Sequence, residues 1–279
     1  MNAIRQTVRS LLRAPALTFA AVLTLALGVA FTTTMFSVVD AVVLKPLPFR
    51  DPDRVVAISD VNVKTAARDQ VSATNFADVA ERAKTLQSPS LWIRQPVTIA
   101  GSGDPERVES LRVQPSLFVA FGVSPVVGRG FRDREERVIV LGASFWQSHF
   151  GGDPGVIGSS VRVDGVAHTI IGILPPHFRY PDADVALWQP LVLKDFEKRF
   201  RAKRMFEAVA RLAPGATLAQ ARAEVKTIAD GLAREYAEDN RGWTTEVRAA
   251  RDAMAPDART LWLLFGAAVL VLILACANV

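Results

Sequence analysis

The sequence predicts an α+β protein in which one mixed α/β domain lies between two transmembrane helices. Two uncharged apolar runs, residues 14–39 and 261–279, bracket a long polar middle. Within that middle, short β-rich runs alternate with segments whose apolar residues recur at helical spacing. The only cysteine, Cys276, lies in the second apolar run, so a hydrophobic core without disulfides has to stabilise the middle.

Residues 1–14 predict a short amphipathic helix at the membrane interface. Arg5, Arg9 and Arg13 recur at an i, i+4 spacing and leave the apolar side chains on another face of the helix. A frayed basic leader is the alternative interpretation of this segment.

Residues 15–44 predict the first transmembrane helix. The 26 uncharged residues 14–39 extend about 39 Å as a helix, more than a hydrocarbon core of about 30 Å requires. Three arginines precede the run and no acidic residue does, so the N-terminus is expected in the cytoplasm. A cleaved signal peptide is the alternative, but its apolar core is typically about 7–15 residues long and no small-x-small cleavage site ends this run.

Residues 45–258 predict the mixed domain, which begins with a strand-helix unit. The prolines of KPLPF at residues 45–49 prevent a helix from continuing, so this segment marks the exit from the membrane. A strand is predicted over residues 55–59 and a helix over residues 73–86, with Ser72 and Thr74 as candidate caps.

The centre of this domain predicts a compact mixed unit at about residues 91–201. Its β-rich runs are separated by glycine-rich turns, as expected for strands joined by tight connections. The predicted elements are a hairpin of residues 97–100 and 108–113, strands over 138–141, 160–164 and 168–173, and a helix over 144–150.

The C-terminal part of the domain repeats the strand-helix pattern of its beginning. A strand over residues 205–212, a helix beginning at Thr217 and a closing strand over 244–248 are predicted. We therefore expect an outer unit of about residues 53–90 plus 202–250, which encloses the inserted unit. Residues 259–279 predict the second transmembrane helix, which returns the chain to the cytoplasm and is expected to continue beyond Val279.

The charge distribution argues against a nucleic-acid surface. The chain carries a formal net charge of +5, but its basic excess lies at the predicted membrane edges, where it sets topology. The polar middle is close to neutral. No nucleic-acid partner is therefore predicted.

No motif predicts an enzyme. A G-x-x-x-x-G-K-[ST] phosphate loop does not occur, so the chain is not expected to hydrolyse ATP itself. Ser144 lies in GASFW, where a nucleophile elbow needs glycine in place of Trp146. The GRG run at residues 128–130 lacks the third glycine of a dinucleotide loop, so a turn is predicted there.

No catalytic, cofactor-binding or metal-binding residue is predicted either. His149, His168 and His177 share no metal-ligand spacing. The acidic residues at 133–136 are interrupted by an arginine, which is typical of a solvated loop. The scattered tryptophans are expected in the core or at a partner contact. These observations favour a transporter or mechanical-coupling subunit, or a sensor, over an enzyme.

The order of short motifs along the chain resembles one family of membrane proteins. These motifs are RSLLRAP at residues 9–15, VLTLALG at 22–28, FSVVDAV at 36–42, KPLPF at 45–49, FW at 145–146, FGGDP at 150–154, VDG at 163–165, IGI at 171–173, PPHF at 175–178, LWQPL at 187–191 and ACANV at 275–279. They are similar to those of the MacB-type and FtsX-like ABC transporter permeases, and especially of the duplicated orphan permeases of acidobacteria. The family usually has glycine and asparagine where this chain has Ala30 and Thr32.

This resemblance implies a fold and a mechanism. The domain at residues 45–258 would be a periplasmic core domain, a porter-like unit with an inserted second unit, in a four-helix permease of the inner membrane. A separate cytoplasmic ABC ATPase would move the external domains in efflux or envelope remodelling. The implied partners are that ATPase, a second permease module as homodimer or internal duplicate, the lipid membrane and a periplasmic adaptor; no cofactor is implied.

An extracytoplasmic ligand-binding or sensor module anchored by two membrane helices is the alternative. A downstream kinase, cyclase or methyl-accepting sequence would favour the sensor, whereas two further membrane helices would favour the permease.

At Ala30 and Thr32 the departures from the family concern contacts between membrane helices, where we expect Thr32, Thr33 and Thr34 to supply small hydroxyls.

Overall fold

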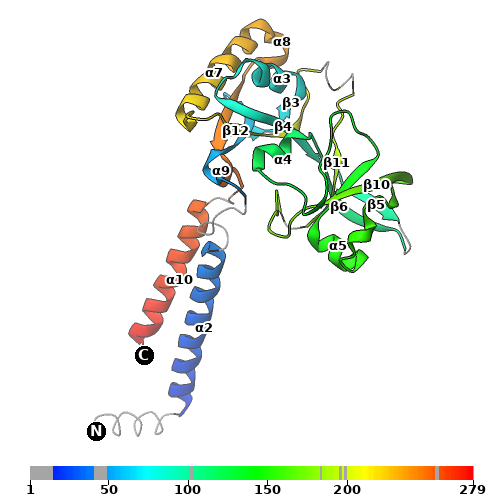
Figure 1. The fold of residues 1–279 in the computed structure, drawn as a ribbon. Helices are drawn as coiled ribbons and strands as arrows, with labels where there is room; N and C mark the ends of the chain where they lie inside the picture. Colours follow the sequence, from blue (N-terminus) through cyan, green and yellow to red (C-terminus); the bar gives the residue numbers. More distant parts are fainter. Residues whose placement is uncertain are drawn as a thin grey trace. The chain divides into compact units, whose positions relative to one another are not determined.

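The structure, a computed structural model, describes residues 15–40, 49–100, 104–182, 184–194, 197, 200–254 and 258–278 (Figure 1). The chain divides into two compact units. The first contains helices α2 (Pro15–Val39) and α10 (Ala258–Asn278), which we call the helical pair. The second, Leu47–Met254, we call the core domain. The predicted interfacial helix of residues 1–14 lies outside the described residues.

The two helices of the helical pair pack against each other through small and aromatic side chains. A Cβ atom added to Gly28 would lie 3.0 Å from Cδ1 of Leu272, so the absence of a side chain there permits the close approach. The rings of Phe36 and Phe265 lie 6.1 Å apart. Many large apolar side chains on both helices are nevertheless exposed, including Phe19, Leu27, Phe31, Leu263, Leu270 and Leu274.

The hydroxyl groups of α2 are bonded within the helix. Thr32 Oγ1 donates to Gly28 O at 2.8 Å and Thr34 Oγ1 to Ala30 O at 2.8 Å. The hydroxyl protons of Thr32 and Thr34 are therefore used within the helix, because the carbonyl one turn earlier lies within reach, and the expected contribution of these hydroxyls to contacts between helices stays a prediction. Among the described residues, no helix has both the length and the hydropathy expected of a membrane span.

Four strands form the outer sheet of the core domain, in the order β13-β1-β12-β4, and every neighbouring pair is antiparallel. They are β1 (Val55–Asn62), β4 (Leu86–Arg94), β12 (Arg204–Leu212) and β13 (Trp243–Ala249). Helix α3 (Ala73–Arg82) leads from β1 towards β4, and α7 (Leu218–Glu235) leads from β12 towards β13. The order corresponds to two interlocked split β-α-β units, as in ferredoxin-like folds.

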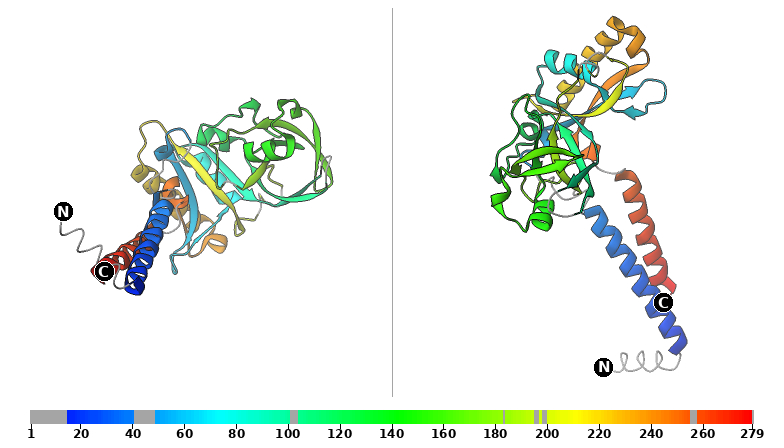
Figure 2. Two further views of the ribbon diagram at one scale, coloured as in Figure 1. Left: turned by 90° about the horizontal axis from the view of Figure 1, so that it is seen from below. Right: turned by 90° about the vertical axis from the view of Figure 1, so that its right-hand side faces the viewer.

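Both helices cover the same face of the outer sheet (Figures 1 and 2). One core cluster fills the space between them and includes Ile58, Phe76, Phe206, Val225 and Leu232. Thr217 and Gln220 form a capping box at the start of α7, which begins one residue after the predicted start at Thr217. The remaining short elements of this part are η2 (Pro52–Arg54), β2 (Arg68–Asp69), β3 (Val71–Ser72), α8 (Ala237–Asn240) and α9 (Ala250–Met254).

The predicted helix over residues 73–86 is too long. Ser72 caps the start of α3, with its Oγ accepting from Asn75 N at 3.3 Å, but the helix ends at Arg82. Glu224 of α7 accepts hydrogen bonds from Lys84 N at 3.0 Å and Thr85 N at 2.9 Å, which holds the backbone in an extended connection to β4. A residue 140 positions away in sequence therefore sets this boundary.

Six strands between β4 and β12 form a closed sheet. They pair in the cyclic order β6-β5-β9-β10-β8-β11, and the parallel pairing of β11 with β6 closes the ring. The strands are β5 (Val97–Ala100), β6 (Glu106–Val113), β8 (Val138–Leu141), β9 (Ser160–Val163), β10 (Val166–Ile173) and β11 (Val185–Pro190). A second core cluster draws on all six strands and on α5 (Ala143–Phe150) and η3 (Pro154–Val156).

A third core cluster lies on the face of the outer sheet opposite α3 and α7. Helix α4 (Ser116–Phe121) contributes Leu117, Phe118 and Phe121, which pack with Trp92 and Trp188. Strand β7 (Val127–Gly128) pairs with the end of β10. The outer sheet and the closed sheet are continuous because β4 also pairs with β6.

The mixed α/β fold class is confirmed. The predicted hairpin of β5 and β6, the strands β8, β9, β10, β12 and β13 and the helix α5 all occur within one or two residues of the predicted bounds. The sequence analysis missed α4, β4 and β11. The proposed bounds of the outer unit and the inserted unit stay a prediction; the first core cluster also includes Leu91 and Leu191 from the range given to the inserted unit.

Candidate functional site

The histidines singled out in the sequence do not converge. His149 Nε2 lies 2.6 Å from Glu106 Oε2, and His168 Nδ1 lies 2.9 Å from Val166 O. His177 borders a separate cavity of about 420 Å³ that is also lined by Phe49. Among the described residues, no group of three or more histidine, cysteine, aspartate or glutamate side chains is arranged to hold a metal ion.

Ser148, His149 and Glu106 form a hydrogen-bonded string that the sequence analysis did not anticipate. Ser148 Oγ lies 2.8 Å from His149 Nδ1, and His149 in turn contacts Glu106. The Ser148 hydroxyl also reaches the carbonyl oxygens of Ser144 at 3.0 Å and Phe145 at 3.2 Å, one turn earlier in α5. Because these carbonyls compete for its proton and neither large cavity of the core domain is lined by Ser148, the string does not resemble a nucleophile site.

The Gly-Arg-Gly motif at residues 128–130 has a structural role. Gly128 and Gly172 pair across β7 and β10, where a Cβ on Gly128 would lie 2.2 Å from Ile171 O. Arg129 binds Glu135 through two hydrogen bonds of 2.9 and 2.6 Å, which hold the pKa of Glu135 below its ordinary value. The acidic cluster at residues 133–136 is thus partly neutralised by this contact.

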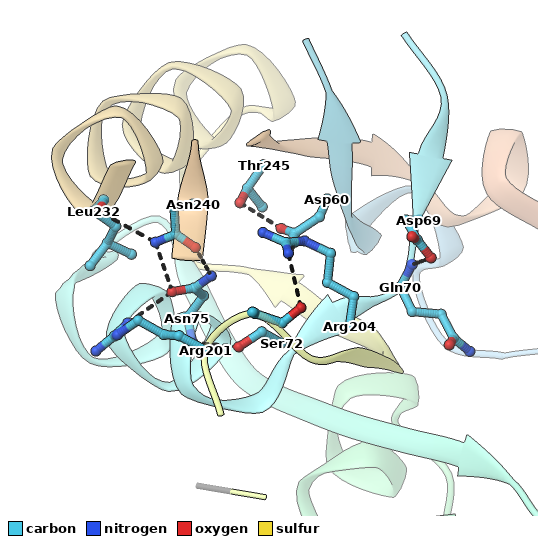
Figure 3. Close-up of polar contacts among 11 residues, drawn as sticks. Asp60, Asp69, Gln70, Ser72, Asn75, Arg201, Arg204, Leu232, Asn240 and Thr245 are labelled. Atoms are coloured by element: carbon cyan, nitrogen blue, oxygen red, sulfur yellow. Dashed lines mark hydrogen bonds and ion pairs between the residues drawn. The ribbon is translucent and has the colours of Figure 1, made fainter. Parts of the chain in front are cut away.

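The main buried polar site lies in the outer sheet (Figure 3). Asp60 of β1 is only 3% exposed and accepts from Arg204 Nε at 3.0 Å and from Thr245 Oγ1 at 2.9 Å. The guanidinium of Arg204 stacks over the ring of Trp243, with its Cζ 4.1 Å from the ring centroid. Three strands, β1, β12 and β13, therefore meet at one ion pair.

Two opposite effects act on the pKa of Asp60. Burial raises the pKa of Asp60 above its ordinary value, and the attraction of Arg204 together with the hydrogen bond from Thr245 opposes that rise. Arg204 Nη2 and Thr244 Oγ1 are buried without a hydrogen-bond partner among the described atoms, and both residues line a small cavity of about 10 Å³. Arg204 Nη1 donates to Ala202 O at 3.2 Å, and Asp60 is the only carboxylate among the described residues that forms an ion pair with Arg204.

A second polar contact adjoins the first (Figure 3). Asn75 of α3 and Asn240 of α8 exchange two amide hydrogen bonds of 2.7 and 3.2 Å. Arg201 Nη1 donates to Asn75 Oδ1 at 2.8 Å and to Asp78 Oδ2 at 2.5 Å, while its Cζ lies 3.7 Å from the ring centroid of Tyr236. This contact links α3, α8 and the segment that leads into β12.

Arg201 and Arg204 bond the segment that leads into β12 to the rest of the outer sheet and its helices. Both belong to the segment that leads from the closed sheet back into the outer sheet, and their partners lie on β1 and α3. The sequence carried one signal for this site. Val56, Ile58 and Asp60 alternate on one face of β1, so a charged residue continues an inward-facing apolar series.

Arg211 bonds the segment at the start of the core domain to the outer sheet. Arg211 of β12 donates to Arg50 O and Ala120 O at 3.0 Å each and to Asp51 Oδ2 at 2.8 Å, and its side chain is 11% exposed. Arg54 Nη2 donates to Leu212 O at 2.6 Å. The segment that begins the core domain is thereby bonded to the middle strand β12 of the outer sheet.

The buried polar groups of the core domain hold its secondary-structure elements together. Its buried charges bond strands and connections to one another, and the groups that the sequence analysis discounted as catalytic stay apart. Of the tryptophans expected in the core or at a partner contact, Trp92 and Trp188 are buried at 7% and 2% exposure, whereas Trp146 and Trp243 are half-buried.

Comparison with known proteins gives matches at the level of domain and fold. A family model described as the MacB-like periplasmic core domain matches residues 18–228. No curated protein matches the chain.

Three solved structures share the fold. A domain of a protein classed as a permease, from Porphyromonas gingivalis, is 17% identical, with a TM-score of 0.55 over 72% of this chain and 92% of that one. The periplasmic region of MacB from Actinobacillus actinomycetemcomitans is 11% identical, with a TM-score of 0.54 over 77% and 95%. The extracellular domain of the noncanonic ABC-type transporter YknZ from Gram-positive bacteria is 11% identical, with a TM-score of 0.51 over 68% and 98%.

Proposed function

Because this chain belongs to the MacB-like periplasmic core domain family, we propose that it is a permease subunit of an ABC-type transporter. In this proposal a separate ATPase hydrolyses ATP, and the permease converts that hydrolysis into movement of its core domain during efflux or envelope remodelling. The family membership supports a permease-type role. Two similar structures, a MacB periplasmic region and the extracellular domain of an ABC-type transporter, point the same way.

The pairing of β1 with β13 carries the mechanical part of the proposal. Val56 pairs with Ala249, so the chain enters and leaves the core domain on neighbouring strands. Phe49 and Met254, close to these two ends, pack against one shared core cluster. A shift of α2 against α10 is therefore expected to act on adjacent strands of one sheet, and Arg211 carries it further to β12 and α4.

We also propose that the helical pair lies in the inner membrane, with the N-terminus in the cytoplasm and the core domain in the periplasm. Residues 14–39 carry no charge, and large apolar side chains of both helices are exposed. The intrahelical bonds of Thr32 and Thr34 satisfy their hydroxyls without water, as an apolar surrounding requires. The partners would be a cytoplasmic ABC ATPase, a second permease module and a periplasmic adaptor.

The proposal is tested on the full-length chain in the membranes of its own host. Cross-linking followed by affinity isolation should recover an ATPase that carries the G-x-x-x-x-G-K-[ST] loop absent from this chain. Hydrogen exchange is then measured on the isolated complex with and without ATP and vanadate. We expect nucleotide-dependent exchange in β1, β12 and β13, because these strands receive the movement of the helices.

An Arg211→Ala variant sharpens this test, and Arg234→Ala is its matched control. Removing Arg211 should abolish the exchange difference at β12 while ATP hydrolysis continues, since this side chain bonds the incoming segment to that strand. Arg234 lies in the last turn of α7 and should leave the difference intact. Recovery of a kinase or cyclase in place of the ATPase would favour the sensor alternative and overturn the proposal.

A further inference from the structure

One end of the closed sheet is filled and the other is open. Helix α5 follows β8 directly and contributes Phe145 to the core cluster, so it covers the end at which β8 finishes. At the opposite end, where β6 and β11 finish, lies a cavity of about 540 Å³. This volume is within the ~300–1,000 Å³ of typical small-molecule sites, and the open ends of closed sheets are common places for such sites.

The charges around this cavity are unbalanced. Arg112, Arg137 and Lys194 line it, whereas Glu136 is the only acidic residue among the described residues of the lining, and His168 also faces it. Neither Arg112 nor Arg137 forms an ion pair with another described residue. Arg112 Nη2 donates to Val192 O at 3.3 Å, which fixes the side chain through a neutral partner and leaves its charge uncompensated.

Arg137 occupies an unfavourable backbone conformation beside the cavity. Its φ of 57° lies in the left-handed region, which costs a residue with a Cβ of the order of 1–2 kcal/mol. A hydrogen bond of 2.9 Å from Thr169 N to Arg137 O holds the backbone in this position. This backbone position is one that glycine adopts freely, so the guanidinium can be removed there by an Arg137→Gly substitution without new backbone strain.

The cavity also has an apolar wall. Pro190, Val192 and Leu193 line it together with the side-chain amide of Gln189, which donates to Ser110 Oγ at 3.0 Å. A ligand for this lining would combine an anionic group with an apolar body. Guanidinium groups suit carboxylate and phosphate because their N–H groups form paired hydrogen bonds with two oxygens.

We propose that this open end of the closed sheet binds a small organic anion, in which a phosphate or carboxylate group is attached to an apolar body. Arg112 and Arg137 bond the anionic group, and Pro190, Val192 and Leu193 contact the apolar body. The site is independent of the proposed coupling to an ATPase, because its residues lie within the core domain and none belongs to the segments that connect to α2 and α10.

Phenyl phosphate is the probe, titrated into the full chain in detergent and followed by isothermal titration calorimetry at fixed ionic strength. Phenylacetate and inorganic phosphate are titrated in parallel. We expect saturable binding of phenyl phosphate and weaker binding of inorganic phosphate, because the latter makes no contact with the apolar wall. Phenylacetate binding tighter than phenyl phosphate would identify the carboxylate as the preferred group.

Two variants and one control locate the site. Arg112→Gln should weaken phenyl phosphate binding at least tenfold. Arg137→Gly removes the guanidinium from a backbone position that glycine adopts freely, so it should weaken binding by a similar factor while the melting temperature stays equal or rises. Arg107→Gln changes the same charge on the exposed, opposite end of β6 and should leave the affinity within twofold.

Two results would overturn the proposal. The first is the absence of saturable binding of any of the three probes to the folded chain. The second is an equal loss of affinity in the Arg107→Gln and Arg112→Gln proteins, because binding would then follow the overall charge of the domain. Neither result would bear on the ATPase experiment.

Discussion

At the scale of single residues, Asp60 and Arg204 are the most consequential pair in the core domain. Both side chains are nearly inaccessible, at 4% and 7% exposure, and they join β1 to β12. Burying two charges costs several kcal/mol per ion, and mutual attraction with good hydrogen bonds offsets most of that cost. Loss of one partner leaves the other charge buried without compensation.

Asp60→Ala is therefore expected to lower the free energy of unfolding by about 3–5 kcal/mol. The double variant Asp60→Ala, Arg204→Met should recover most of this loss, because it also removes the stranded charge. Urea unfolding of the single and double variants measures both values.

Asp230→Ala serves as the surface control for this pair. Asp230 pairs with Lys226 at an i, i+4 spacing on exposed α7, so its loss should cost no more than about 0.5 kcal/mol. A double variant no more stable than Asp60→Ala would show that Arg204 finds compensation elsewhere.

At the scale of secondary-structure elements, the close approach of β7 and β10 sets a strict steric limit. Gly128 has a φ of +75°, and a Cβ there would meet Ile171 O at 2.2 Å. Gly165, in the turn between β9 and β10, has a similar φ of +80° but nothing within 4 Å of its added Cβ. Comparing these two glycines separates backbone strain from steric overlap.

Gly165→Ala should lower the free energy of unfolding by about 1 kcal/mol, because only the left-handed backbone conformation opposes the added Cβ. Gly128→Ala should cost more than about 3 kcal/mol, because the backbone strain and the overlap with Ile171 add. Thermal unfolding of both proteins gives the comparison. Equal losses would mean that β7 moves away from β10 without penalty.

Local sequence signals account for most elements but not for their pairing. The strands β8, β10 and β12 are runs of apolar residues between turn signals. The start of α7 is marked by the capping residues Thr217 and Gln220. Helix α3 was predicted too long because Glu224 ends it from another part of the chain. Closure of the six-stranded sheet depends on the pairing of β11 with β6. The spacing of apolar residues within each strand does not predict which strands pair.

The polar site was less predictable than the fold. Arg204 and Asp60 lie 144 positions apart, so only the tertiary structure brings them together. Asp60 nevertheless interrupts an apolar alternation in β1, and that interruption is the kind of local conflict that marks a buried charge. The residues of the cavity at the open end of the closed sheet come from four separate strands or loops and had no shared signal.

At the scale of the whole molecule, the core domain satisfies the requirements of an independently folding unit. Its residues form one compact unit with three core clusters, and the only cysteine of the chain lies outside it. We therefore expect residues 45–258 to be soluble and folded in isolation. We expect its stability to come from packing and buried polar contacts.

The isolated piece should unfold at the same temperature with and without a chelator and with and without a reducing agent. Circular dichroism during heating measures this. The full chain in detergent, which keeps α2 and α10, is the matched comparison. A lower melting temperature in the presence of chelator would reveal a metal that the fold needs.

The two ends of the core domain lie on neighbouring strands, so we expect that the domain can be moved into another protein as one piece. Val56 faces Ala249 across the ladder, and neighbouring strands are about 4.8 Å apart. Gene segments for such a domain can be grafted between other pairs of helices, or into a surface loop of an unrelated host, without forcing the flanking segments apart. The β1–β13 pairing thus gives the core domain two ends that meet, which is the geometry that an inserted domain needs.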